Sequence, residues 1–153
     1  KQNTMEINTL ELATYIVRQA FMNKKDLAGE PYVEHLFRVK SNLQNTHYKH
    51  NTWILIIALL HDILEDCPEW NETILRQLFN DTIVDAVILL TRLPNQSYDE
   101  YIDIIAKSEN DYAIYVKRAD LLDNLQITRL PILKPKDLQR IKKYHKAYKI
   151  LTN

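Results

Sequence analysis

The chain has 153 residues, of which 46% are hydrophobic, and its 20 basic and 20 acidic residues cancel. This length and composition fit one domain with a buried core and exclude a disordered chain. A neutral chain without a basic block gives no reason to expect nucleic-acid or membrane-surface binding, and no apolar run approaches the roughly 20 residues of a membrane span. The single cysteine, Cys67, excludes an internal disulfide, and no secretory signal is recognisable. We therefore expect a cytoplasmic protein with no nucleic-acid or membrane partner.

Only one glycine, Gly29, occurs in the chain. P-loop and Rossmann fingerprints need several glycines so that the backbone can approach a phosphate, and tight hairpins usually need glycine as well. Both nucleotide-binding fingerprints are therefore excluded, and an extended sheet is disfavoured. We predict an all-α fold with a single domain over residues 1–153.

Apolar residues recur at helical spacing along most of the chain. Asn51 or Thr52 is a suitable N-cap for the central helix, and Pro68 ends that helix. The polar segment 23–30 is predicted to be a loop. The predicted helices, in chain order, cover residues 9–22, 31–45, 53–66, 71–79, 81–92, 98–107, 110–128 and 137–151.

The second half of the predicted central helix carries an unusual group of polar residues. His61, Asp62, Glu65 and Asp66 follow directly on an apolar run. At about 100° per residue, these four side chains would share an arc of about 140°. Carboxylates are rarely buried unless they are paired or bind a metal, and mixed histidine and carboxylate ligands suit a divalent cation. The alternative is an ordinary helix end with a solvated charged face.

Two further residues favour the metal interpretation. His35 lies about one turn into the helix predicted over 31–45, and Asp120 interrupts the apolar helix predicted over 110–128. A lone histidine is more often a hydrogen-bonded structural residue, but a buried Asp120 requires a partner. Two imidazoles and two carboxylates, with His61 and Asp62, would bind one divalent cation and leave positions open for water and substrate.

Three ordered segments resemble the HD-domain metal-dependent phosphohydrolases. The similarity is strongest to the hydrolase domain of the RelA/SpoT family, and within it to the free-standing small alarmone hydrolases. It covers roughly residues 9–130, ahead of the helix predicted at 137–151. The segments that carry it read GEPYVEH at 29–35, ALLHDILED at 58–66 and VKRADLLDN at 116–124.

This resemblance implies a single HD-domain helical bundle that hydrolyses the 3′-pyrophosphate of guanosine tetra- or pentaphosphate, a small-molecule nucleotide, with manganese. By position, it implies that the metal ligands are His35, His61, Asp62 and Asp120. It implies that Glu65 and Asp66 handle protons or position the attacking water. The residues expected to contact the nucleotide are Asn124, Lys117, Tyr32 and Lys25, although Tyr32 could equally be a packing residue.

The chain departs from the family pattern at three places. Residues 24–28 read KKDLA where multidomain members carry an Arg-Lys pair whose arginine stacks on guanine. The family's Arg-Leu-His-Asn is Leu-Leu-Asp-Asn at 121–124, and Leu36 replaces a proline. None of these changes removes a predicted metal ligand, but two affect recognition of the base or phosphate.

Two other functions therefore stay open. One is the same chemistry on another nucleotide, such as removal of the 2′-phosphate of a nicotinamide dinucleotide. The other is a nucleotide-sensing module without turnover, against which the presence of Glu65 and Asp66 argues. The sequence does not fix the oligomeric state.

Overall fold

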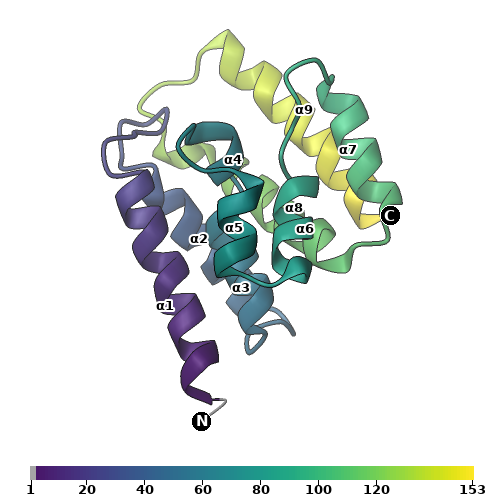
Figure 1. The fold of residues 1–153 in the computed structure, drawn as a ribbon. Helices are drawn as coiled ribbons and strands as arrows, with labels where there is room; N and C mark the ends of the chain where they lie inside the picture. Colours follow the sequence, from purple (N-terminus) through teal and green to yellow (C-terminus); the bar gives the residue numbers. More distant parts are fainter. Residues whose placement is uncertain (1–2) are drawn as a thin grey trace.

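Helices form nearly all of the regular structure in the computed structural model, which describes residues 3–153, with side chains from residue 9 onward. Within these residues the only strand-like pairing is an isolated bridge between Lys25 and Pro31. The all-α prediction is confirmed. The helices, shown in Figure 1, are α1 (Asn3–Ala20), α2 (Val33–Gln44), α3 (Thr52–Leu60), α4 (Ile63–Asp66), α5 (Glu72–Leu78), α6 (Asp81–Leu89), α7 (Tyr98–Lys107), α8 (Asp111–Asn124), the 3₁₀ helix η1 (Ile127–Arg129) and α9 (Pro135–Thr152).

Helix α3 is the centre of the core. Its residues from Ile54 to Leu60 are all buried, and α1, α2, α6 and α8 pack around it. Such a uniformly apolar helix is stable only inside a protein, where each aliphatic side chain gains about 1.5–3 kcal/mol from burial. Asn51 caps it by accepting a hydrogen bond from the Ile54 N–H at 3.1 Å, as predicted. Packing in the core thus fixes the position of the C-terminal end of α3.

The prediction of one continuous helix through Asp66 is wrong at residues His61 and Asp62. Helix α3 ends at Leu60, the chain turns through these two residues, and α4 begins at Ile63. The His61 imidazole bonds the Ala58 carbonyl oxygen at 2.6 Å, which competes with the bonding pattern of a continuing helix. The four polar side chains of this segment therefore do not share one helical face.

The C-terminal region also differs from the predicted boundaries. Helix α8 ends at Asn124, four residues early, and η1 follows it after a short turn. Helix α9 begins at Pro135, a residue type favoured in the first turn of a helix. It packs on α7 and α8 (Figure 1). Some of its side chains line a cavity next to the predicted metal site. None of the helices in residues 3–153 has both the length and the apolar character that a membrane crossing requires.

Candidate metal centre

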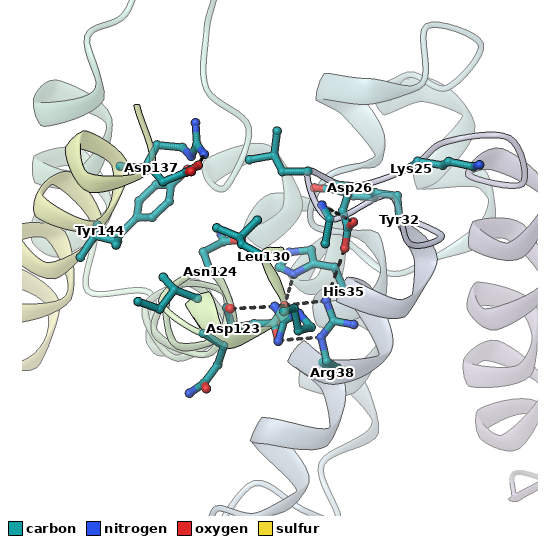
Figure 2. A pocket seen from close by; sticks show the side chains of 17 residues that line it. Lys25, Asp26, Tyr32, His35, Arg38, Asp123, Asn124, Leu130, Asp137 and Tyr144 are labelled. Atoms are coloured by element: carbon teal, nitrogen blue, oxygen red, sulfur yellow. Dashed lines mark hydrogen bonds and ion pairs between the residues drawn. The ribbon is translucent and has the colours of Figure 1, made fainter. Parts of the chain in front are cut away.

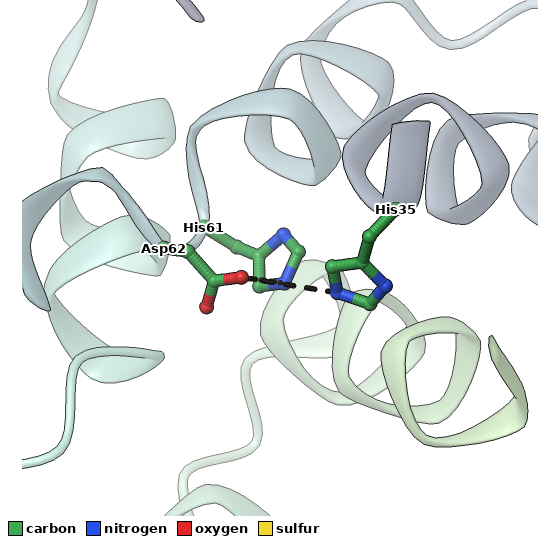
Figure 3. Close-up of side chains that lie close together, drawn as sticks. All are labelled: His35, His61 and Asp62. Carbon is green, nitrogen blue, oxygen red and sulfur yellow. Dashed lines mark ion pairs between the residues drawn. The ribbon is translucent and has the colours of Figure 1, made fainter. Parts of the chain in front are cut away.

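The four predicted metal ligands lie together in the interior, delivered by three segments of the chain. His35 comes from α2, His61 and Asp62 from the turn between α3 and α4, and Asp120 from α8. One nitrogen or oxygen atom from each of His35, His61 and Asp62 lies within 4.8 Å of the others (Figure 3). Asp120 Oδ1 lies 2.9 Å from His35 Nε2 and 3.4 Å from His61 Nε2. Residues more than 80 positions apart in sequence thus share one small volume.

Both imidazoles present the same ring nitrogen to this volume. His61 Nδ1 donates to the Ala58 carbonyl at 2.6 Å, and since a carbonyl oxygen only accepts, the proton belongs on Nδ1. His35 Nδ1 lies 2.6 Å from Asp123 Oδ2, which imposes the same arrangement. Each Nε2 is thereby directed inward, the orientation that a metal-binding histidine needs.

The donor atoms fit a divalent cation. His61 is 2% exposed, and its Nε2 has no hydrogen-bond partner among the described residues. It nevertheless lies 3.2 Å from Asp62 Oδ2 and 3.4 Å from Asp120 Oδ1. An unprotonated ring nitrogen facing two carboxylates is unfavourable unless a proton or a cation lies between them. Nitrogen and carboxylate donors together suit manganese, iron or zinc.

Charge interactions shift the pKa values of the centre strongly. Burial lowers the pKa of His35, but its bonds to Asp120 and Asp123 outweigh burial and raise it to about 9. In the same way, Asp62 and Asp120 outweigh burial and raise the pKa of His61 well above its ordinary value. Without a cation, the imidazoles therefore hold protons that a metal ion has to displace.

Lys117 and Asn124 hold Asp120 in place. The buried Lys117 Nζ lies 2.8 Å from Asp120 Oδ2, and Asn124 Nδ2 donates to Asp120 Oδ1 at 3.1 Å. The Lys117 ion pair is the main reason why the pKa of Asp120 stays well below its usual range despite burial. This bond engages the ammonium that we predicted to contact phosphate, so that role of Lys117 stays a prediction.

Glu65 and Asp66 lie on α4, beside the centre. The Glu65 carboxylate accepts a hydrogen bond from the Arg92 backbone N–H. Partial burial raises the pKa of Glu65, an effect that the Arg92 bond opposes, and burial together with Asp62 raises the pKa of Asp66. Raised carboxylate pKa values suit proton transfer near neutral pH, but the assignment of these two residues as catalytic stays a prediction.

A cavity of about 410 Å³ opens beside the metal centre (Figure 2). Three predicted nucleotide contacts line it: Lys25, Tyr32 and Asn124. Tyr32 also donates to Asp62 Oδ2 at 2.7 Å and stacks on Phe21 with ring centroids 5.3 Å apart. Its hydroxyl therefore positions a predicted ligand while its ring packs, and its contact with the nucleotide stays a prediction.

Sequence reasoning missed part of this cavity. In the sequence, Asp123 is visible only as a departure from a family motif, and no feature of residues 137–151 links them to the site. The missed lining residues include Arg38, Asp123, Arg129, Arg140 and Tyr144. Only the fold brings them together, because no periodicity or spacing in the sequence links them.

Comparisons with known proteins show what the chain is similar to. The family model described as "HD domain" matches residues 13–140. A guanosine-3′,5′-bis(diphosphate) 3′-pyrophosphohydrolase of Haemophilus influenzae is 31% identical over 137 residues, covering 84% of this chain and 20% of that relative. The bifunctional (p)ppGpp synthase/hydrolase SpoT of Escherichia coli K12 is 27% identical over 145 residues, covering 89% and 20%. The chain thus spans about a fifth of the length of these relatives.

A solved structure, described as a metazoan ortholog of SpoT that hydrolyses ppGpp, superimposes with a TM-score of 0.80. It is 24% identical, and the match covers 94% of this chain and 85% of the other. The two chains share the same fold.

Removal of Asp120 is expected to abolish metal binding. The wild-type protein should bind about one divalent ion per chain and gain thermal stability from it, because a ligand that binds only the folded state stabilises it. Asp120→Ala should lose both effects in calorimetry and thermal melts with Mn²⁺. Since that change leaves Lys117 without its partner, His61→Asn serves as a second variant. Asp103→Asn, which alters an exposed pair with Lys107, is the control. Unchanged Mn²⁺ binding in Asp120→Ala would show that the ligands are assigned wrongly.

The stabilisation by Mn²⁺ is expected to increase as the pH rises from 6.5 towards 9. His35 binds its proton more tightly in the folded than in the unfolded protein, with a folded pKa of about 9. The stability that this proton gives the folded state is fully present below pH 6.5 and is lost as the pH rises through about 9. The metal-free protein should therefore lose stability in this window. The cation has fewer protons to displace there, so its effect on Tm should grow. Melting curves at pH 6.5, 7.5 and 8.5 test this, and a Tm increment that shrinks with pH would contradict it.

Proposed function

Because the chain belongs to the HD-domain family, we propose that it is a metal-dependent hydrolase that removes the 3′-pyrophosphate of guanosine tetra- or pentaphosphate. The observation that carries the proposal is the convergence of His35, His61, Asp62 and Asp120 around the Nε2 atom of His61, which has no hydrogen-bond partner in the described part of the chain. The HD domain implies a divalent cation, and manganese is the ion we propose. The names of the two bacterial relatives support the choice of nucleotide.

The chain's own residues would hold the reacting groups in place. A divalent cation bound at this centre would act as a Lewis acid on a phosphoryl oxygen and would lower the pKa of a bound water. Tyr32 and Asn124 fix the carboxylates of Asp62 and Asp120 through hydrogen bonds of 2.7 and 3.1 Å. Such positioning provides much of the rate enhancement in phosphoryl transfer.

The proposed reaction moves one proton. Water adds to the phosphorus next to the 3′ oxygen, and the bond between that phosphorus and the 3′ oxygen breaks. Glu65, with its raised pKa, is the proposed acceptor of the water proton, and Asp66 lies next to it on α4. The carboxyl groups of Glu65 and Asp66 would return this proton to the leaving 3′ oxygen, which becomes a hydroxyl. The products are pyrophosphate and the nucleoside 5′-diphosphate or 5′-triphosphate.

The cavity supplies cationic groups for a phosphorylated ligand. Lys25, Arg38, Arg129 and Arg140 line it, and Tyr144 offers an aromatic ring. Three of these cations already touch acidic side chains: Arg38 and Arg129 contact Asp123, while Arg140 contacts Asp137. Because these cations are already paired with carboxylates, we expect the cavity to select a ligand that makes specific contacts and not to attract anions in general.

A second substrate class deserves testing because the base-recognition loop is altered. Asp26 Oδ1 accepts hydrogen bonds from the Ala28 and Glu30 backbone N–H groups, both at 2.9 Å. The carboxylate therefore shapes the loop where multidomain relatives are expected to carry an arginine–lysine pair. A nicotinamide dinucleotide with a 2′-phosphate is the alternative substrate.

Product analysis tests the proposed function directly. Guanosine tetraphosphate, guanosine pentaphosphate, the adenosine analogue and NADPH are incubated with and without Mn²⁺. Products are resolved by anion-exchange chromatography, and pyrophosphate is detected with malachite green after added pyrophosphatase. We expect GDP and pyrophosphate from the tetraphosphate only with the metal. Preferred release of phosphate from NADPH would establish the alternative substrate, and binding without turnover of any nucleotide would indicate a sensing module.

Glu65→Gln is expected to lose turnover by a factor of about 10² or more while retaining the metal, the usual effect of removing a general base. The glutamine keeps the size of the side chain and its acceptor for the Arg92 N–H. Steady-state kinetics and Mn²⁺ calorimetry on the same preparation separate the two effects. Glu69→Gln, an exposed neighbour, is the matched control. Turnover near the wild-type value in Glu65→Gln would remove Glu65 from the mechanism.

Base selectivity is expected to be loose. An arginine stacked on a purine contributes roughly 0.5–2 kcal/mol, and the lysines that precede Asp26 do not stack as a planar guanidinium does. The adenosine analogue should therefore reach a kcat/KM within about tenfold of the guanosine compound, since 1.36 kcal/mol corresponds to one decade. The comparison is made at equal Mn²⁺. A thousandfold preference for guanine would show that other residues read the base.

A further inference from the structure

Asp123 is a buried carboxylate that the proposed reaction does not use. It lies on α8, three residues after Asp120, and is 3% exposed. Its Oδ2 lies 2.6 Å from His35 Nδ1, and its Oδ1 accepts from Arg38 Nε at 2.7 Å. Arg38 Nη2 adds a second bond to Oδ2 at 3.2 Å, and Arg129 Nη2 lies 3.4 Å from the same oxygen. Figure 2 shows this group at the wall of the cavity.

The position of Asp123 distinguishes it from the predicted ligands. The opposite nitrogen of the same ring, His35 Nε2, lies 2.9 Å from Asp120 Oδ1 and 3.8 Å from Asp62 Oδ2. The His35 ring therefore stands between Asp123 and the centre. A carboxylate at Nδ1 keeps the proton on that atom and the lone pair of Nε2 directed at a cation, and it makes the imidazole a stronger ligand.

The two imidazoles of the centre are oriented by partners of different chemistry. His61 Nδ1 donates to the Ala58 backbone carbonyl, which is neutral and fixed by the helix. His35 Nδ1 bonds a charged side chain that belongs to another helix. The orientation of His35 therefore depends on a residue that can be substituted without altering the backbone.

Arg38 in turn holds Asp123. His35 and Arg38 are three residues apart on α2, so their side chains lie on one face of the helix, towards α8. The two-pronged contact of the guanidinium with both carboxylate oxygens fixes the plane of the carboxylate and compensates its burial. An ion pair between α2 and α8 needs only Arg38 and Asp123, yet the shortest bond of Asp123 goes to the imidazole.

We propose that Asp123 is a positioning residue of the metal centre, which fixes the orientation and proton position of His35, and that Arg38 acts through it. The inference rests on the proposed metal site. Asp123, which departs from the family pattern in the 121–124 segment, would thus support the predicted metal ligand His35.

Metal affinity measured without substrate tests this role. Asp123→Asn keeps the shape of the side chain and an acceptor oxygen but removes the charge. We expect its Mn²⁺ affinity in calorimetry to fall about 10- to 100-fold, the usual effect of removing a partner behind a metal-binding histidine. Val84→Ala on α6 is the control: it removes buried volume, so it should lower Tm while Mn²⁺ affinity stays unchanged.

Two further readouts separate positioning from mere stability. In the protein loaded with diamagnetic Zn²⁺, the Nδ1 proton of His35 should give a far-downfield NMR signal that moves upfield in Asp123→Asn. Arg38→Gln should also weaken Mn²⁺ binding, but it should have little further effect in the Asp123→Asn background, because interactions through a shared partner are not additive. Additive losses would contradict the proposed order of action.

The outcomes are distinguishable from those of the proposed function. Normal Mn²⁺ binding by the wild type together with unchanged affinity and an unchanged His35 signal in Asp123→Asn would overturn the role of Asp123 alone. A wild-type protein that binds no Mn²⁺ would overturn both this role and the proposed function.

Discussion

The Nε2 atom of His61 is buried beside two carboxylates and has no hydrogen-bond partner among the described residues. Its Nδ1 proton is committed to the Ala58 carbonyl, so Nε2 can be satisfied only by an added proton or a cation. The backbone enforces this arrangement, because α3 is buried and ends where the His61 imidazole donates a hydrogen bond to the Ala58 carbonyl of that helix. The break between α3 and α4 therefore places two predicted ligands, His61 and Asp62, at the end of the most deeply buried helix.

Two buried carboxylates of this region, Asp120 and Asp123, can remain ionised because each has a cationic partner. Asp120 pairs with Lys117, and Asp123 pairs with Arg38, while both also touch His35. Burying such charges without partners would cost several kcal/mol per ion. The side chain of Lys117 also lies near the aromatic rings of Tyr98 and Tyr101, with Nζ 5.8 and 5.1 Å from their centroids. The helices thus hold these carboxylates in place together with the cations that compensate their charge.

Sequence reasoning predicted the helices and the four candidate ligands because those features are local or ordered along the chain. Periodicity and caps located most helix ends within a few residues, and the three motif segments identified His35, His61, Asp62 and Asp120. The helix break at His61 escaped prediction, since a bond from a side chain to the backbone leaves no trace in hydrophobic periodicity. The bond between His35 and Asp123 joins residues 88 positions apart and depends on the packing of α2 against α8. The contribution of α9 to the cavity likewise depends on tertiary packing alone.

We infer that these buried groups are arranged to bind one divalent cation. Crystals of the wild-type protein grown with Mn²⁺, with data collected at the manganese absorption edge, test it most directly. We expect one strong anomalous peak bounded by His35 Nε2, His61 Nε2 and the carboxylates of Asp62 and Asp120, at ligand distances of about 2.0–2.3 Å. A fully loaded crystal with the peak elsewhere, and with His35 Nε2 still bonded to Asp120 Oδ1, would contradict it.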